Sequence, residues 1–518
     1  MSRRTLLLLA ALTIASAVVY VTRLGYAPAY VMHDETQFAL QAESIAASGR
    51  DLSGRFLPLF FAEPEFPAGR DPVIIYLTAA ALAWLPFSEA SVRTPTALLG
   101  VLNIALMFLL ARRLFGSDSM ALVAAGLLAM TPAHFIRSRL LLSPQSSIPF
   151  VLAWLLCVAA FSERPTTRRL AMAGGWLGLG AYTYLACMVM MPLYLAMTIL
   201  LGHRLLGRRG AVVAGAAFVI PLIPMVLWYA THPERWGQVI DAYQLYSGRG
   251  AGAAAPIAGA VSSAMRTTVG LIWSFFSPAF LFLSGDSSLI NSTRLVGFFP
   301  LSFAVFMPLG VLRLAKNGGA MGWVILAGLA TAPLAAIVSG AIEMNRILFV
   351  IPFGVLTATY GVDWLIGARA HIWRAVALVL VAAVPVQFGG FYWDYMGRYR
   401  VEASQWFGGN TRDVFITAIE RAGLDSQHRV YVSHAIPFAD RYWRFYALER
   451  GRRDLIDRMV RYDTASPANA LLGSDLVCSL ATTECQALLR GDTAWSLVRQ
   501  ITELDGTPSF ALFEKRRP

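Results

Sequence analysis

Long apolar runs, repeated along the whole sequence, constrain the fold of this chain more than any other feature. Of its 518 residues, 57% are apolar and only 14% are charged. A helix needs about 17 to 25 apolar residues to cross the hydrocarbon of a bilayer, and eleven runs approach this length. We therefore expect an α-helical polytopic membrane protein rather than a soluble globular domain. The runs centre on residues 5–22, 95–111, 119–136, 147–161, 170–187, 188–202, 211–230, 298–312, 320–339, 347–366 and 375–391.

The basic residues predict how these spans are inserted. With the N-terminus in the cytoplasm, every internal connection carries arginine or lysine, as the positive-inside rule requires. This agreement holds only if residues 72–87 do not cross, so we place that short segment in the outer interface. The first run is expected to stay as a helix and not to be cleaved as a signal peptide, because apolar residues continue through 18–21. The loop residues are Arg3, Arg4, Arg112, Arg113, Arg164, Arg168, Arg169, Arg204, Arg208, Arg209, Arg313, Lys316, Arg369 and Arg374.

Three regions are expected on the extracytoplasmic side of a bacterial inner membrane. Two of them, residues 23–94 and 231–297, are outer loops of a transmembrane domain that spans residues 1–390. The third, residues 391–518, is charged and alternating in pattern, which predicts a small α/β domain. Because the net charge of +12 is explained by the internal loops, we expect no nucleic-acid partner.

Two elements and a cysteine pair are predicted inside this C-terminal region. Residues 413–422 have a helical pattern and residues 429–432 read as a strand. Cys478 and Cys485 are compatible with a local disulfide in an oxidising compartment, although their spacing leaves both states open. The other two cysteines, Cys157 and Cys187, fall within spans and are expected to be reduced.

A pair of carboxylates, Asp34 and Glu35, follows the first apolar run. Charged groups beside lipid are costly and usually mark chemistry or a substrate path. A carboxylate within about 3 Å of a hydroxyl group can take its proton while the oxygen attacks, so Asp34 is our candidate general base. Glu35 would tune or orient it, and His33 could set its protonation state. The alternative is that Asp34 caps a helix over residues 35–47, and the two roles are compatible.

Three motifs resemble the bacterial branch of glycosyltransferase family 39. They are HDETQF at 33–38, RDPVIIY at 70–76 and VRTPTALLG at 92–100. This family comprises integral-membrane GT-C enzymes related to dolichyl-phosphate-mannose protein mannosyltransferases and to the aminoarabinose transferase that modifies lipid A. The resemblance covers residues 1–390. It identifies the superfamily but says little about the substrate. Further matches lie at 111–116, 138–139, 182–184, 232–234 and 280–286.

The resemblance implies an inverting transfer of one monosaccharide from a polyprenyl-phosphate donor to a hydroxyl group of a glycan, lipid or protein acceptor. Outward-facing arginines would stabilise the charge that grows on the departing phosphate. Our candidates are Arg70, Arg137, Arg139 and Arg346. Relatives place an arginine near the lipid phosphate where Arg346 stands, whereas Arg70 replaces the lysine that usually precedes Pro-Pro. An arginine that only reaches along the interface is the alternative for each of them, and most of all for Arg137.

Three further residues are predicted to bind substrate. Tyr184 would contact sugar or lipid, with membership of an interfacial aromatic belt as the alternative. His232 could instead be a helix-boundary residue, and Asp286 could serve only to shape a turn. No metal ligand is assigned, since residues 138–147 lack the carboxylate that many GT-C enzymes carry in this loop. A divalent cation is left open as a cofactor, and membrane lipid is an expected partner.

Two other functions remain open from the sequence. A lipid or solute transporter would also need many spans, but the polar candidates here fall in outer loops and not at mid-membrane. A catalytically silent relative that acts as an assembly partner would fit the missing carboxylate in 138–147. The presence of Asp34 and Glu35 argues against that interpretation.

Overall fold

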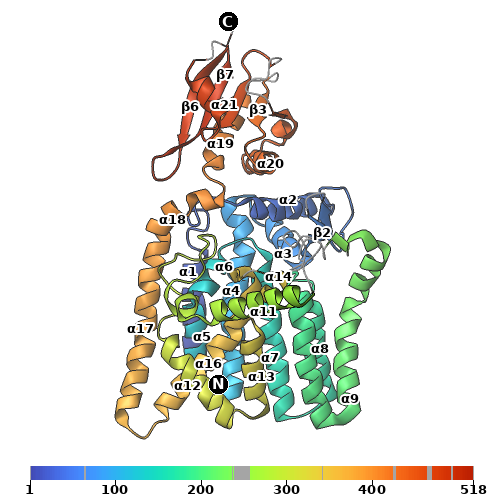
Figure 1. The fold of residues 1–518 in the computed structure, drawn as a ribbon, viewed down its shortest axis with the longest axis vertical. Helices are drawn as coiled ribbons and strands as arrows, with labels where there is room; N and C mark the ends of the chain where they lie inside the picture. Colours follow the sequence, from blue (N-terminus) through green and yellow to red (C-terminus); the bar gives the residue numbers. More distant parts are fainter. Residues whose placement is uncertain are drawn as a thin grey trace. The chain divides into compact units, whose positions relative to one another are not determined.

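The computed structural model describes residues 2–63, 66–235, 237–238, 257–340, 342–423, 428–463, 470–491 and 494–516 (Figure 1). The chain divides into two compact units. Unit 1 contains Met1–Thr22, Pro58–Ile74 and Pro95–Trp393, and unit 2 contains Arg23–Leu57, Ile75–Thr94 and Asp394–Pro518. Most of the first expected outer loop therefore belongs to the same compact unit as the C-terminal region.

Unit 1 is built from apolar helices. By length and composition, seven helical segments of the described residues can cross a membrane, or eight if the bent pair α5 (Asp118–Ala129) and α6 (Pro132–Ser138) is one span. The chain thus has the predicted architecture of a polytopic helical membrane protein. The seven are α1 (Arg3–Val21), α4 (Glu89–Phe115), η1 with α7 (Ser143–Ser147 and Ile148–Glu163), α9 (Cys187–Thr231), Met265–Leu283, α13 with α14 (Gly319–Thr331 and Leu334–Ser339), and α17 with α18 (His371–Met396 and Arg398–Glu402).

Each of the eleven predicted runs contains helix, although runs 170–187 and 298–312 extend beyond α8 and α12 and not each helix passes this test. α8 (Thr167–Gly180), α12 (Phe303–Asn317) and α16 (Val350–Ile366) are shorter than 18 residues. They pack against other helices of unit 1, α8 against α9 and α12 against α16, and stand beside them in Figure 1. Eleven crossings therefore stay a prediction.

The helix α9 contains two of the predicted spans, joined by a turn. Gly207 has φ +61° and leaves the helical conformation. A Cβ atom on Gly210 would lie 2.3 Å from the carbonyl oxygen of Gly202. Eight residues of continuous helix would separate these glycines by about 12 Å, so the chain must turn back between them. The predicted spans 188–202 and 211–230 are thus the two arms of a helical hairpin.

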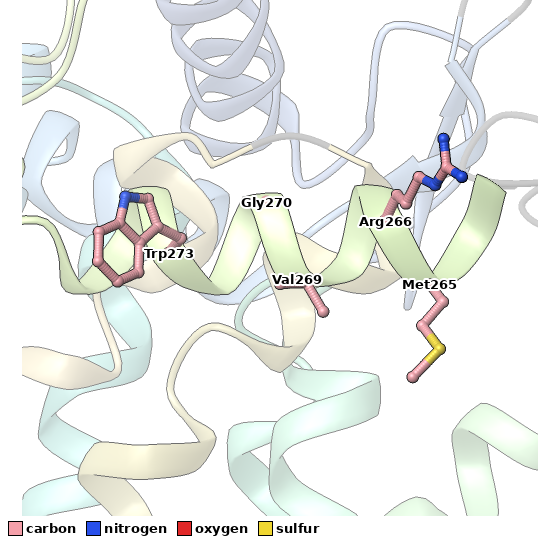
Figure 2. Close-up of a pocket in the computed structure, with 5 residues that line it drawn as sticks. All are labelled: Met265, Arg266, Val269, Gly270 and Trp273. Atoms are coloured by element: carbon pink, nitrogen blue, oxygen red, sulfur yellow. The ribbon is translucent and has the colours of Figure 1, made fainter. Parts of the chain in front are cut away.

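One helix fits the predicted in-plane segment, and a second lies across its neighbours. α3 (Pro72–Leu82) has eleven residues, a length of about 16 Å, which cannot cross about 30 Å of hydrocarbon. α11 (Ile257–Phe276) lies in the expected outer loop 231–297 and runs across the direction of the neighbouring helices in Figure 1. Its described part is amphipathic, because Met265 and Val269 point to one side and Arg266 to the other (Figure 2).

The C-terminal part of unit 2 is an α/β fold. Its five-stranded sheet has the order β4-β3-β5-β7-β6, in which β3 pairs in parallel with β4 and β5, and β7 pairs antiparallel with β5 and β6. The predicted helix and strand appear as α19 and β3. The elements are η3 (Ser404–Phe407), α19 (Thr411–Ala422), β3 (Val430–Ser433), α20 (Ala439–Glu449), η4 (Arg453–Arg458), β4 (Met459–Tyr462), β5 (Asp475–Ser479), α21 (Thr483–Leu489), β6 (Trp495–Thr502) and β7 (Pro508–Lys515).

A disulfide joins β5 to α21 through Cys478 and Cys485. The spacing of the two cysteines left the bonded and the free state open, and the structure has the bonded state. Both residues are buried in a small core with Leu476, Trp495 and Phe513. Cys157 and Cys187 are free, as expected for residues within spans.

Candidate active site

Glu35 and Arg93 form a buried, two-point ion pair in unit 2. Arg93 Nε lies 2.8 Å from Glu35 Oε1, Arg93 Nη2 lies 2.8 Å from Oε2, and neither side chain is exposed. The backbone N–H of Met32 also donates to Glu35 Oε2, at 3.2 Å. Arg93 donates further to the carbonyl oxygens of Leu24 and Tyr30, at 2.9 and 2.7 Å. The pair therefore fixes the first turn of α2 (His33–Ser48) to the loop before it.

Asp34 lies in this fixed turn. Its side chain is 29% exposed, whereas that of Glu35 is fully buried. The alternative that Asp34 caps the helix is wrong, because α2 begins at His33 and its N-cap is Met32. Asp34 occupies the first turn instead, where the positive end of the helix dipole stabilises a carboxylate.

His33 connects this turn to the C-terminal part of unit 2. Its Nε2 lies 3.8 Å from Asp34 Oδ1, and its ring stacks on Phe438 with 4.4 Å between centroids and 7° between planes. Phe438 is the N-cap of α20 and has a left-handed backbone, with φ +54°. The sequence did not indicate this contact, because 405 residues separate the two rings.

One face of α20 meets the starts of both α2 and α4. Tyr442, one turn beyond Phe438, is buried, and burial together with the nearby charges of Glu35 and Asp34 raises its phenol pKa above the ordinary value. Farther along the same face, the Tyr446 hydroxyl donates to Glu89 Oε1 at 3.1 Å. Positions four residues apart share a helix face, so α20 packs along both segments.

Glu89, the first residue of α4, is the centre of a second polar cluster that sequence reasoning missed. Its Oε2 lies 3.0 Å from Arg412 Nη1, and its backbone N–H donates to Glu449 Oε1 at 3.1 Å. The Arg412 guanidinium also lies over the Tyr30 ring, 4.9 Å from its centroid. Burial raises the pKa of the Glu449 carboxyl group above its usual range.

Asp286 is a structural turn residue in unit 1. It is 5% exposed and accepts hydrogen bonds from Ser288 N at 2.9 Å, Asn291 Nδ2 at 2.7 Å and Met344 N at 3.0 Å. These bonds tie its loop to the start of α15 (Met344–Ile347). Asp286 thus shapes a turn, as the alternative given above expected. A substrate-binding role for Asp286 stays a prediction.

Asp286 also lies near two of the arginines. Arg137 donates to Asn291 Oδ1, and Arg346, on the helix that Asp286 holds, lies 3.7 Å from Glu343 Oε2. The Arg346 side chain is 19% exposed. The structure therefore joins the three segments that carry Arg137, Asp286 and Arg346, through Asn291 and the backbone of Met344.

Arg139 caps the C-terminal end of α1. It is fully buried, and its Nη1 donates to the carbonyl oxygens of Tyr20 and Thr22, at 2.8 and 2.9 Å. A cation at a helix C-terminus is favourable, because that end carries partial negative charge. These contacts differ from the interfacial arginine that was the alternative, and a role toward a lipid phosphate stays a prediction.

The remaining predicted residues lie at separate places in unit 1. His232 is the C-cap of α9 and stacks on Trp228 with 4.7 Å between ring centroids, which is the boundary role weighed above. Tyr184 is half-buried between α8 and α9. Arg70 ends β2 (Phe66–Arg70), which pairs with β1 (Phe61–Glu63), and its side chain lies outside the described residues. Substrate contacts of these three residues stay predictions.

Neighbouring Tyr182 has a role that the sequence did not indicate. Its hydroxyl donates to the carbonyl oxygen of Pro221 at 2.7 Å and accepts from Met225 N at 3.2 Å. The hydroxyl thus takes the place of an internal hydrogen bond of α9, which is one way a helix bends. Among the described residues, no cluster of three His, Cys, Asp or Glu side chains could hold a metal ion.

Comparisons with known proteins bear on the fold. The sequence model of the family described as dolichyl-phosphate-mannose-protein mannosyltransferase matches residues 67–228. ArnT from Cupriavidus metallidurans, solved in the apo state, is 16% identical with a TM-score of 0.61, and the match covers 97% of each chain. The same protein bound to undecaprenyl phosphate is 15% identical with a TM-score of 0.64, covering 99% of this chain and 98% of that one. This chain has a GT-C glycosyltransferase fold.

A third solved structure belongs to a different kind of transferase. The archaeal oligosaccharyltransferase AglB from Archaeoglobus fulgidus, in complex with an inhibitory peptide and a dolichol-phosphate, is 15% identical with a TM-score of 0.50. The match covers 86% of this chain and 64% of AglB. A search of curated proteins found no match. The resemblance to family 39 inferred from the motifs thus agrees with the family model and with the fold.

Proposed function

We propose that the protein transfers a monosaccharide from a polyprenyl-phosphate donor to a hydroxyl acceptor at the extracytoplasmic face of the membrane. The observation that carries this proposal is the fold match to ArnT over nearly the whole chain, in the form bound to undecaprenyl phosphate. The family model adds a second transferase that uses a lipid-phosphate sugar. The donor class is therefore inferred from two separate comparisons.

Asp34 would act as the general base. The acceptor hydroxyl attacks the anomeric carbon, its proton passes to the Asp34 carboxylate, and the bond to the lipid phosphate breaks. One direct displacement inverts the configuration of that carbon. The different environments of the two carboxylates support this role. Glu35 is buried and paired with Arg93, whereas the Asp34 carboxylate is partly exposed.

The departing phosphate needs positive charge, since negative charge grows on it as the bond breaks. We propose Arg346 first among the arginines, because its guanidinium is partly exposed and its ionic contact among the described residues is a long one, 3.7 Å to Glu343. Arg139 comes second, as its guanidinium already caps α1. Arg70 is retained from the resemblance alone.

The test is sugar transfer in membranes that contain the full chain. A panel of radiolabelled polyprenyl-phosphate sugars is supplied, and product is compared with membranes that lack the protein. Formation of product from at least one donor, with an inverted anomeric configuration by NMR, would support the proposal. Product from nucleotide sugars but from no polyprenyl-phosphate sugar would contradict it.

A further inference from the structure

A cavity lined by three arginines lies where α4 ends and α8 begins. It has a volume of about 360 Å³, and the residues that line it come from these two helices, from α7 and from the α8 N-cap, all in unit 1. Arg113 belongs to the last turn of α4, whereas Arg168 and Arg169 belong to the first turn of α8. The positive-inside pattern predicts that this end of the helices faces the cytoplasm.

The first turn of α8 carries positive charge, which is unusual for the N-terminal end of a helix. A helix N-terminus has partial positive charge, so acidic residues normally occupy its first turn. The first turn of α8 has two arginines and no acidic residue. Thr166 caps one backbone N–H, as its Oγ1 accepts from Arg169 N at 3.4 Å. The cavity therefore combines guanidinium groups with a helix N-terminus, and an anion is the complementary ligand.

The three arginines differ in how firmly the protein holds them. Arg169 donates to the carbonyl oxygens of Ala160 and Arg164, at 2.6 and 3.0 Å, and so closes the end of α7. Arg113 Nε lies 3.3 Å from Glu163 Oε1 in a pair that is 36% and 46% exposed. Within the described residues, the exposed guanidinium of Arg168 forms no ion pair or hydrogen bond. Arg168 is thus the group that a ligand can engage at least cost.

The rest of the wall is apolar. Leu156 of α7 and Met172 of α8 line the cavity, and Met172 is 48% exposed. A free inorganic anion would gain nothing from these side chains, whereas an acyl chain would pack on them. Basic pockets between membrane helices at the cytoplasmic face are known to bind anionic lipid headgroups. We propose that this cavity binds an anionic phospholipid, with its phosphate at Arg168 and Arg113 and an acyl chain along Leu156 and Met172.

The probe for the test is phosphatidylglycerol, titrated into the purified full chain and counted by native mass spectrometry. Arg168→Ala is the decisive variant, because removing an exposed side chain with no internal partner leaves the fold intact. Arg208→Ala is the matched control, since Arg208 is an exposed arginine in the turn of α9 and does not line the cavity. One surface arginine near an anionic lipid is worth about 1 kcal/mol, so we expect about fivefold weaker binding by Arg168→Ala and unchanged binding by Arg208→Ala.

Two further arms separate the sources of the phosphate. Phosphatidylcholine, which has no net charge, should bind equally to all variants, and millimolar inorganic phosphate should not displace phosphatidylglycerol. Equal phosphatidylglycerol binding by the wild type and Arg168→Ala would overturn the site. Displacement of the lipid by inorganic phosphate would overturn the lipid assignment in favour of a free anion.

Discussion

The carboxylate of Glu35 and the guanidinium of Arg93 meet in two parallel contacts of 2.8 Å, with both side chains fully buried. Burial of two charges is costly, and such a pair is stable only when the remaining donors are also satisfied. Here the other guanidinium N–H groups reach the carbonyl oxygens of Leu24 and Tyr30. The relationship explains why Glu35 is a structural anchor in a turn whose neighbour, Asp34, is partly exposed.

Removal of one partner should destabilise the protein strongly. Arg93→Ala leaves a buried carboxylate without its cation, and losses of about 3–5 kcal/mol are typical of such changes. Arg93→Lys should recover only part of the loss, because an ammonium group cannot form the two parallel contacts. Thermal unfolding of the detergent-solubilised protein measures both variants.

An exposed ion pair of the same unit provides the control. Arg398, 44% exposed, lies 2.7 Å from Glu402, which is 46% exposed, and 2.8 Å from Asp394. Exposed pairs contribute about 0–1 kcal/mol, so Arg398→Ala should shift the unfolding temperature far less than Arg93→Ala. Similar shifts in the two variants would refute the structural role of the Glu35 and Arg93 pair.

The ring of Phe438 should affect activity independently of stability. Its stack on His33 is worth about 0.5–1.5 kcal/mol, so Phe438→Ala is expected to lower the transfer rate by up to about tenfold. Phe438→Tyr keeps the ring and should behave as the wild type. Phe438→Gly loses the ring but relieves a left-handed backbone that costs a non-glycine residue about 1–2 kcal/mol. The glycine variant should therefore unfold at a temperature no lower than the alanine variant, but it should transfer sugar as slowly. A wild-type transfer rate for both variants would contradict a role of the Phe438 ring in activity.

The disulfide between Cys478 and Cys485 should stabilise the C-terminal sheet. The two cysteines lie seven positions apart in the sequence, and closure of so short a loop contributes about 2–3 kcal/mol in the chain-entropy account. The variant Cys478→Ser/Cys485→Ser should therefore unfold at a lower temperature. Labelling of the denatured wild type with a maleimide checks the bond itself, because two thiols should react without reductant and four with it. Four reactive thiols without reductant would show that the bond is absent.

The predicted orientation places the C-terminal domain outside the cytoplasm. Alkaline phosphatase fused after residue 518 should then be active, since it folds only in an oxidising compartment, whereas a fusion within the Arg208 turn of α9 should be inactive. The reverse pattern would show that the chain is inserted the other way.

Most of the secondary structure that could be predicted followed from residue patterns within short segments of the sequence. Apolar length located helix at all eleven runs, and alternation located α19 and β3 in the C-terminal region. The contact partners of single residues could not be predicted from such patterns. Glu35 and Arg93 are 58 positions apart in the sequence, and His33 and Phe438 are 405 positions apart. The same limit explains why the sequence indicates only substrate-binding, surface or turn roles for Asp286 and Arg139. Their bonds to Met344 and to the end of α1 exist only once the helices have packed.

The most direct test of the proposed function is the transfer activity of Asp34→Asn at equal expression. Loss of a general base typically lowers a rate by about 10²–10⁴-fold, so this isosteric change should abolish detectable product from a donor that the wild type uses. Asp463→Asn, at a carboxylate 82% exposed in the same unit, is the matched control and should retain wild-type activity. Equal product from the wild type and Asp34→Asn would contradict the assignment of Asp34 as the base.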